Sequence, residues 1–386
     1  MKPLATGIRA LCAATLFPAA LAAPLPAWAA YIQENLVSDL PGVAATTDPN
    51  LQNPWGISSS PTGPLWVSDN GTGVSTIYDT NGTKQPLTVT IPPPAGATPP
   101  SAPTGQVFNS TNAFSLPSGG KASFIFATED GTLAAWNAAQ GSTARLTADN
   151  SASGAVYKGL AIGSVGNHDY LYATNFHAGT VDVFNGSFAQ SHLTGSFKDS
   201  NLPAGFAPFD IQNIGGKLYV TYAKQDADKH DDVAGLGNGF IDVFNLNGHL
   251  ERRLVTKGVL NSPWGLALAP SGFGQFSKDL LVGNFGDGMI HAFDPASGAL
   301  KGTLTDASGK PITIEGLWGL KFGNGGKGGL LDELFFTAGI PGGGQIEDHG
   351  LFGDIRPATV PEPSSLMLLM AALAGAVGIK RLRKSR

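Results

Sequence analysis

The sequence predicts an all-β protein, a six-bladed β-propeller, and two observations lead to that prediction. The first is an internal repeat whose spacing is that of a propeller blade. The second is a series of short apolar runs separated by turns rich in Gly, Asn and Asp, with no segment of helical periodicity between the two ends. The 52 glycines and 27 prolines of the chain suit many tight turns.

The repeat centres on a short motif of an aromatic residue followed by glycine. Its clearest copies are residues 53–57, 262–266 and 316–320, with weaker copies at 207–211 and 156–160 and a degenerate one at 111–114. The apolar position that ends the motif falls at residues 57, 114, 160, 211, 266 and 320. The resulting intervals of 57, 46, 51, 55 and 54 residues match a four-stranded blade.

Each motif is followed by the same two predicted strands. The first, rich in β-branched and aromatic residues, covers 65–68, 124–127, 171–174, 218–221, 280–283 and 334–337. The second follows a polar turn and covers 74–79, 132–137, 180–185, 240–245 and 289–294. In the sixth unit the Gly-rich segment 340–344 interrupts the pattern, and the third strand is not identifiable.

The N-terminal segment 31–37 is expected to close the ring. It lies just before the first motif, in the same way that segment 250–255 lies just before the fifth motif. Segment 250–255 is a predicted outer strand. Because the sixth unit runs out of chain before an outer strand of its own, the N-terminal strand is expected to complete blade six. Such closure removes exposed sheet edges.

The first 30 residues have the three parts of a cleavable secretory signal. Lys2 and Arg9 carry the positive charge, residues 10–23 are apolar, and Ala27-Trp28-Ala29 forms a small-x-small cleavage site. The apolar part is too short to cross about 30 Å of hydrocarbon. The alternative is a retained N-terminal anchor.

The C-terminal segment 359–386 has the three parts of a membrane-sorting tail. Val360-Pro361-Glu362-Pro363 precedes an uncharged apolar run at 364–379 and a basic cluster at 380–386. The run predicts a single transmembrane helix of about 24 Å, with the basic cluster on the cytoplasmic side and the body, residues 31–358, outside the cytoplasm.

These three parts in this order resemble the PEP-CTERM sorting tail of Gram-negative bacteria. The resemblance implies recognition by an exosortase, cleavage near Pro-Glu-Pro and release or re-anchoring at the cell surface. An uncleaved tail would leave an inner-membrane protein with its propeller in the periplasm. An ordinary C-terminal anchor is the alternative, with the same topology.

The repeats resemble NHL and gluconolactonase-like propellers and lack the Gly-His and Trp-Asp signatures of WD40 repeats. Residues 35–42, 53–58 and 66–73 together resemble a family of exported bacterial propellers that often carry PEP-CTERM tails. This resemblance spans nearly the whole mature chain and implies the fold without a particular activity.

Charge and cysteine content exclude several functions for the body. The chain has 24 Lys and Arg against 29 Asp and Glu; without the two ends, 17 basic residues face 28 acidic ones, a net charge of −11. Such a surface repels phosphate backbones, so nucleic acid is not an expected partner. The sole cysteine, Cys12, lies in the signal, which leaves no thiol for a disulfide, a nucleophile or a metal site.

The turns at one mouth of the channel are rich in oxygen ligands. The candidate ligand-binding residues there are Asp69, Asn70, Glu129, Asn175, His177, Asn284 and Asp287. Such side chains suit a hard cation such as Ca²⁺ or the hydroxyls of a sugar. The alternative is that Asn and Asp are present because tight turns favour them.

Two residues interrupt the repeat near the axis and are also candidate ligand-binding residues. Small residues occupy the position after the motif's aromatic in blades one, three, five and six, and Ala113 is assigned there in blade two, but Asp210 stands there in blade four. A buried carboxylate needs a cation, a water or a donor. Lys158, which stands where three blades have Trp, is the candidate donor; the alternative is that backbone and water satisfy both.

The long turn of blade four is a candidate calcium loop. Asp226, Asp228 and Asp232, together with Asp231, place four carboxylates within seven residues. The segment lacks the central Gly and the terminal Glu of an EF-hand loop, and a solvated charge run is the alternative.

No catalytic residue is assigned, because Gly-x-Ser-x-Gly, His-Glu-x-x-His and P-loop motifs are all absent. The leading hypothesis is a binding or structural propeller of the cell surface or matrix, with an exopolysaccharide or envelope protein as partner. The main rival is a metal-dependent hydrolase or lyase of lactonase type, whose metal set would be imitated by Glu129, Asn175, Asp210 and Asn284. A protein scaffold that uses the blade sides is the third.

Overall fold

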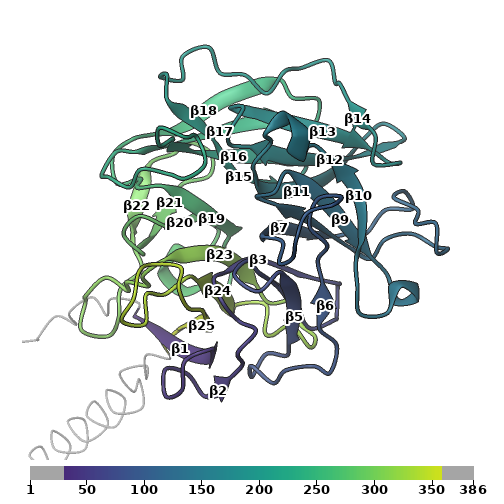
Figure 1. The fold of residues 1–386 in the computed structure, drawn as a ribbon. Helices are drawn as coiled ribbons and strands as arrows, with labels where there is room; N and C mark the ends of the chain where they lie inside the picture. Colours follow the sequence, from purple (N-terminus) through teal and green to yellow (C-terminus); the bar gives the residue numbers. More distant parts are fainter. Residues whose placement is uncertain (1–29, 359–386) are drawn as a thin grey trace, which may run out of the picture.

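The computed structural model describes residues 30–358, which form six antiparallel sheets that follow one another around a central axis (Figure 1). The predicted six-bladed propeller is confirmed. Within the described range no helix combines the length and the apolar character that a membrane crossing requires. The predicted signal and the C-terminal span fall on residues 1–29 and 359–386, outside that range.

The first five blades each contain four strands in chain order. Blade one comprises β3 (Pro54–Ser59), β4 (Leu65–Asp69), β5 (Val74–Tyr78) and β6 (Val89–Thr90), and blade two β7 (Pro103–Phe108), β8 (Phe124–Thr128), β9 (Thr132–Trp136) and β10 (Arg145–Asp149). Blade three comprises β11 (Tyr157–Val165), β12 (His168–Asn175), β13 (Thr180–Asn185) and β14 (Gln190–Ser191). Blade four comprises β15 (Phe206–Ile214), β16 (Lys217–Lys224), β17 (Gly239–Asn245) and β18 (Leu250–Thr256), and blade five β19 (Pro263–Leu268), β20 (Leu280–Asn284), β21 (Ile290–Phe293) and β22 (Leu300–Thr303). Three single-turn 3₁₀ helices lie in loops, at Ala138–Gln140, Ser151–Ser153 and Gly274–Phe276.

Blade six is closed by the N-terminal strand, as the sequence predicts. It comprises β23 (Leu317–Phe322), β24 (Leu334–Ala338) and β25 (Leu351–Pro357), followed by β1 (Tyr31–Ser38) and β2 (Thr46–Thr47). Strand β1 pairs antiparallel with β25 from Tyr31 opposite Pro357 to Ser38 opposite Leu351. Strand β25 is the third strand that the sequence left unidentified, and the parallel addition of β2 is unexpected.

The motif assigned to blade two is wrong. Its inner strand is β7, so the equivalent of Gly56 is Gly105 and not Ala113, and the residue that ends the motif is Gln106 and not Phe114. The strand begins with Pro-Thr-Gly in place of Pro-Trp-Gly, and this loss of the aromatic residue concealed it. Phe114 lies instead in a loop, with a positive φ of 64°.

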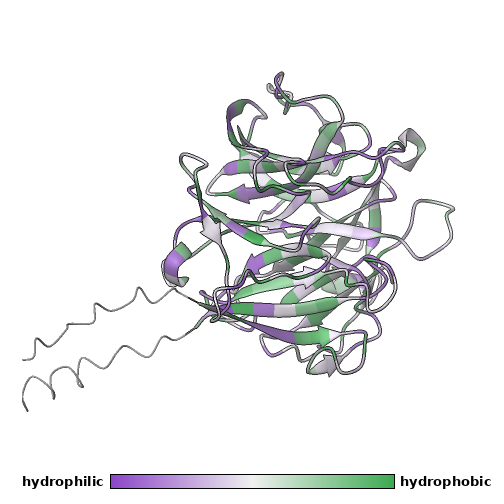
Figure 2. Cartoon of the chain, turned by 90° about the vertical axis from the view of Figure 1, so that its left-hand side faces the viewer, coloured by the Kyte–Doolittle hydropathy of each residue, from purple (hydrophilic) through white to green (hydrophobic). Residues whose placement is uncertain are grey.

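The core consists of apolar layers between successive blades, built from alternate residues of the strands (Figure 2). Threonine hydroxyls add bonds between neighbouring blades: Thr104 of β7 donates to the Tyr157 carbonyl of β11 at 2.7 Å, and Thr174 of β12 donates to the Phe209 carbonyl of β15 at 3.0 Å. These bonds join successive blades near the axis, where side chains are small.

Glycine is required where the inner strands converge. A Cβ built on Gly105 would lie 2.4 Å from the backbone nitrogen of Leu160, and one on Gly265 would lie 2.5 Å from the Trp318 carbonyl oxygen. Five blades therefore have glycine at this position, and only blade four carries a side chain there, that of Asp210.

Candidate functional site

A layer of aromatic side chains closes the channel at the mouth end of the inner strands. Trp55 and Trp318 stack with their ring centroids 3.5 Å apart, and Trp264 meets both edge-on at 5.8 Å. Phe285 stacks on the other side of Trp318 at 4.0 Å, and Phe209 lies 5.8 Å from it. This aromatic layer replaces an open channel with a packed floor.

Lys158 takes the place of the tryptophan in blade three and brings a charge to this layer. Its Nζ donates to Glu129 Oε1 and, at 3.2 Å, to Asp231 Oδ1, and it lies 5.1 Å from the centre of the Trp55 ring. Burial alone would lower the pKa of Lys158, but the carboxylates of Glu129 and Asp231 outweigh it and raise that pKa. The ammonium is therefore charged and is shared between the two carboxylates, of which Asp231 also contacts His230.

Amide side chains extend this network around the mouth. Asn70 Nδ2 donates to the second oxygen of Glu129 at 2.8 Å. Asn53 accepts from the Trp318 indole at 3.0 Å and donates to Glu347 Oε1 at 3.1 Å. Burial, followed by the negative charge of Glu129, raises the pKa of Glu347 to about 7. Side chains from five blades are thus joined in one polar network, which we call the mouth network. Its members are Asn53, Asn70, Glu129, Lys158, Asp231, Trp318 and Glu347.

One group of possible metal ligands occurs among residues 30–358. Glu129, His230 and Asp231 each place a ligand atom within 4.8 Å of the others. The hydrogen bond between His230 Nδ1 and Asp231, 3.0 Å long, raises the pKa of the histidine and lowers the pKa of the aspartate. However, the Lys158 ammonium already contacts both carboxylates, so a divalent ion would have to displace it.

The comparisons with known proteins support both the tail and the body. Residues 359–384 match the PEP-CTERM protein-sorting motif. The chain is 35% identical to uncharacterized protein R648 of Acanthamoeba polyphaga mimivirus over 319 residues, which covers 79% of this chain and 76% of the viral protein. It is also 35% identical to uncharacterized protein L690 of the same virus, over 77% of this chain and 80% of that protein. The chain belongs to the family of these two viral proteins.

Two solved structures match this family member at low sequence identity. A streptogramin B lyase matches with a TM-score of 0.50 and 11% identity, over 86% of this chain and 99% of the lyase. An α-L-arabinofuranosidase from Fusarium graminearum matches with a TM-score of 0.51 and 10% identity, over 85% of this chain and 98% of that chain. Likeness at this level shows the fold alone.

Only three of the residues predicted at the mouth meet in the mouth network: Asn70, Glu129 and Lys158. Three others, Asp69, Asn284 and Asp287, hydrogen-bond within their own blade at or beside the strand ends. Asp69 accepts from the Thr76 amide at 3.0 Å, Asn284 Nδ2 donates to the Val259 carbonyl at 2.8 Å, and Asp287 accepts from the Met289 amide at 3.1 Å.

In blade three the two predicted residues also lie apart from the network. Asn175 donates to Asp182 at 3.0 Å and accepts from the Ala178 amide at 3.2 Å, so its amide stabilises the turn. His177 is exposed beside Gly154. The lactonase-like set of Glu129, Asn175, Asp210 and Asn284 is therefore not assembled around one point.

The carboxylates of the candidate calcium loop are not brought together either. Asp226 accepts from the His230 amide at 2.9 Å, which closes the turn, and Asp228 is exposed. Burial raises the pKa of Asp232 to about 6. The fourth acid of the segment, Asp231, turns toward Lys158 and joins the mouth network.

Asp210 does not pair with Lys158, although the sequence led us to expect Lys158 as its hydrogen-bond donor. Its backbone amide donates to Thr221 at 2.9 Å and its Oδ2 accepts from Gln212 Nε2 at 3.3 Å. It stands one residue further along its inner strand than Phe209, beyond the aromatic layer. Burial raises the pKa of Asp210 to about 7.

Two members of the mouth network, Asn53 and Glu347, were not predicted from the sequence. Asn53 is the first residue of the clearest motif and has a positive φ of 45°, and Ser262, the first residue of the fifth blade's motif, has a φ of 48°. The amide at the first position of the repeated motif was a usable signal for Asn53. Glu347 had none, because it comes from the irregular segment before β25.

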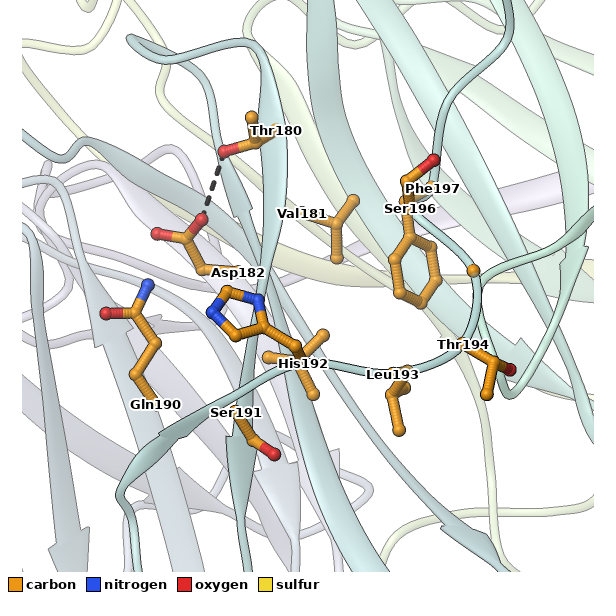
Figure 3. Close-up of a pocket in the computed structure, with 12 residues that line it drawn as sticks. Thr180, Val181, Asp182, Gln190, Ser191, His192, Leu193, Thr194, Ser196 and Phe197 are labelled. Carbon is orange, nitrogen blue, oxygen red and sulfur yellow. Dashed lines mark hydrogen bonds between the residues drawn. The ribbon is translucent and has the colours of Figure 1, made fainter.

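A surface groove of about 390 Å³ lies at the edge of blade three (Figure 3). It opens because β14 has only two residues, so the chain from His192 to Phe197 diverges from β13. The carboxylate of Asp182, which lines the groove, already accepts three hydrogen bonds. The donors are Thr180 at 3.0 Å, Tyr157 at 2.9 Å and Asn175 at 3.0 Å. This groove therefore offers no free carboxylate for chemistry.

Proposed function

We propose that this chain is an exported binding propeller, displayed at the cell surface or in the extracellular matrix, whose mouth network holds its ligand. The PEP-CTERM motif supports export and recognition by an exosortase-type enzyme. In this proposal residues 1–30 are the signal, 31–358 the propeller and 359–386 the sorting tail, which holds the protein in the membrane until it is processed.

The observation that carries a binding role is the position of the Lys158 ammonium. It is hydrogen-bonded to both Glu129 and Asp231, and the aromatic layer closes the channel below it. A hydrolase would need a free base, a nucleophile or an open metal position, whereas this mouth presents acids and amides already held in place. Pre-organised polar groups of this kind suit recognition without reaction.

The ligand class that fits is polyhydroxylated or cationic. Carboxylate and amide oxygens accept hydrogen bonds from sugar hydroxyls, and the acidic body disfavours anionic partners. An extracellular polysaccharide is the first candidate, and a basic segment of an envelope protein is the second.

Binding of the purified protein to the extracellular polysaccharide of its host tests the proposal. Glu347→Gln combined with His230→Ala should weaken binding by about tenfold, roughly 1.4 kcal/mol, because both change the open side of the mouth network. Glu251→Gln, on the exposed outer strand of blade four, is the matched control and should bind as wild type. Equal binding by all three proteins would contradict a role for the mouth and favour a scaffold that uses the blade sides.

A metal-dependent hydrolase or lyase is the second candidate function, favoured by the cluster of Glu129, His230 and Asp231. It predicts a bound divalent ion, turnover of a lactone or uronide substrate, and loss of that turnover with EDTA. Lys158→Met should then increase metal affinity, because it removes the competing ammonium.

A further inference from the structure

A small closed cavity lies on the axis beyond the aromatic layer. Glycines of the inner strands form much of its wall, together with Trp264, and the polar side chains that reach it belong to Gln106, Asp210 and Gln212. Its volume of about 10 Å³ is room for roughly one water-sized particle.

Gln106 is already engaged and contributes little to this cavity. Its Nε2 donates to the carbonyls of Gly56, at 2.8 Å, and Trp66, at 3.0 Å, and its Oε1 accepts from Ser58 at 2.8 Å. Asp210 and Gln212 are therefore the side chains that have hydrogen-bonding capacity left for a guest.

The Asp210 carboxylate is the unusual group in this cavity. The residue is fully buried, and its Oδ1 has no hydrogen-bond partner among residues 30–358. Within the same range, the ion pairs present do not include Asp210. A buried carboxylate without a counter-charge costs several kcal/mol, so it binds a cation or takes up a proton.

We propose that the axial cavity binds one monovalent cation of the size of Na⁺, held by the Asp210 carboxylate. The charge favours a monovalent ion, because one carboxylate balances one positive charge and a divalent ion would leave an uncompensated charge in the same apolar surroundings. The size favours Na⁺, which occupies about the space of a water molecule.

Gln212 supplies a second oxygen ligand. Its amide faces Asp210 Oδ2 at 3.3 Å, and a half-turn of the amide exchanges nitrogen for oxygen at that position. The backbone of Gly56, Gly105 and Gly319 also lines the cavity. This inference concerns the far side of the aromatic layer and is independent of what the mouth binds.

The rival state is a protonated Asp210 with one water in the cavity. It is chemically plausible because burial raises the pKa of this carboxyl to about 7. The two states differ in a measurable way, since a protonated carboxyl gives no dependence on the kind of cation present.

Thermal unfolding of the purified full-length protein in sodium chloride and in choline chloride, at equal ionic strength and pH 8, distinguishes the two states. Wild type should melt roughly 2–4 °C higher in sodium than in choline, which is too large for the cavity. Asp210→Asn should lose that difference. Asp228→Asn, which neutralises an exposed carboxylate of the same blade, should keep it.

Asp210→Gly, which gives blade four the residue of the other five, is the second variant if Asp210→Asn fails to fold. It should also show no difference between the two salts. A sodium effect of equal size in wild type and Asp210 variants would overturn the proposal. A shift produced by calcium chloride and not by sodium chloride would overturn the monovalent assignment.

Discussion

Two acidic sites lie on opposite sides of one aromatic layer, and they are stabilised in opposite ways. On the mouth side, Glu129 and Asp231 share the ammonium of Lys158. On the axial side, Asp210 lies among glycines with one oxygen unpartnered within the described residues. The difference follows from what surrounds each site, because mouth loops can provide charged side chains whereas the crowded inner strands surround Asp210 with glycines and the neutral amides of Gln106 and Gln212.

The two substitutions that create these sites occur in neighbouring blades. Blade three replaces the motif's aromatic by Lys158, and blade four replaces the next residue, glycine, by Asp210. One step along an inner strand is therefore enough to move a charge from a solvated network into a sealed cavity.

Removing the layer that separates the two sites should have the largest effect. Trp318 contacts Trp55, Trp264, Phe209 and Phe285, so Trp318→Ala leaves a large cavity at the axis. We expect it to lower the free energy of unfolding by about 3–5 kcal/mol, measured by urea denaturation. Leu330→Ala, at an exposed position, is the control and should change it little. A loss below about 1 kcal/mol for Trp318→Ala would show that the layer is not a packed unit.

Removing the Lys158 ammonium that Glu129 and Asp231 share should have the second largest effect on stability. Lys158→Met keeps the length of the side chain but leaves Glu129 and Asp231 close together with only His230, which contacts Asp231, as a partner. We expect a loss of about 2–3 kcal/mol in the free energy of unfolding, below the usual cost of breaking a buried pair because Asp231 is largely exposed. Adding Glu129→Gln should recover part of this loss, and a double variant no more stable than Lys158→Met would contradict the pairing.

The smallest effect should appear in the pH dependence of stability. Burial raises the pKa of Glu347 to about 7, above that of an unfolded glutamate, so the folded state holds this proton more tightly. Its contribution is fully present below about pH 4 and is lost as the pH rises to about 7. Relative to Glu347→Gln, wild type should therefore lose about 1 kcal/mol across that window, less than the roughly 3 kcal/mol of the full pKa difference because solvent screens this partly exposed carboxyl. Urea denaturation at each pH measures this loss.

Ionisation of Asp210 should lower the stability of the folded state as the pH rises, as for Glu347, but only when the proposed cation is absent. In choline chloride, wild type should lose stability relative to Asp210→Asn between about pH 4 and 7. In sodium chloride this loss should shrink, because the cation stabilises the carboxylate, whereas the Glu347 difference should persist. Identical profiles in both salts would argue for the proton in place of the cation.

The repeat allowed most of the fold to be predicted, because each blade repeats the same order of strands and turns. The predicted strand 180–185 coincides with β13, and the closing role of segment 31–37 is confirmed by β1. The failure in blade two has a physical reason: Thr104 can replace an aromatic in the axial layer, whereas Gly105 cannot be replaced without a backbone clash. Searching for the glycine first would have located β7.

The site was harder to predict, because the residues that suit a ligand are also those that suit a turn. Asn70 is the residue after β4 and Asn284 is the last residue of β20, yet Asn70 reaches Glu129 across the mouth whereas Asn284 bonds the loop that enters its own blade. The choice depends on loop length and on neighbours from other blades. Asp231 illustrates this, since its partner Lys158 lies 73 residues away.

The pairing of β1 with β25 also determines when the propeller can fold. The amide of Ala358 donates to the carbonyl of Ala30 at 2.7 Å, so the last described residue is bonded to the first. If the body crosses the membrane unfolded, as the proposed signal implies, blades one to five can form as they emerge, but blade six requires both ends of the body in the same compartment. Until residue 357 has crossed, β1 would then be an unpaired strand that a chaperone or a neighbouring chain could capture. In such an export, completion of the ring would require that the whole body has crossed the membrane.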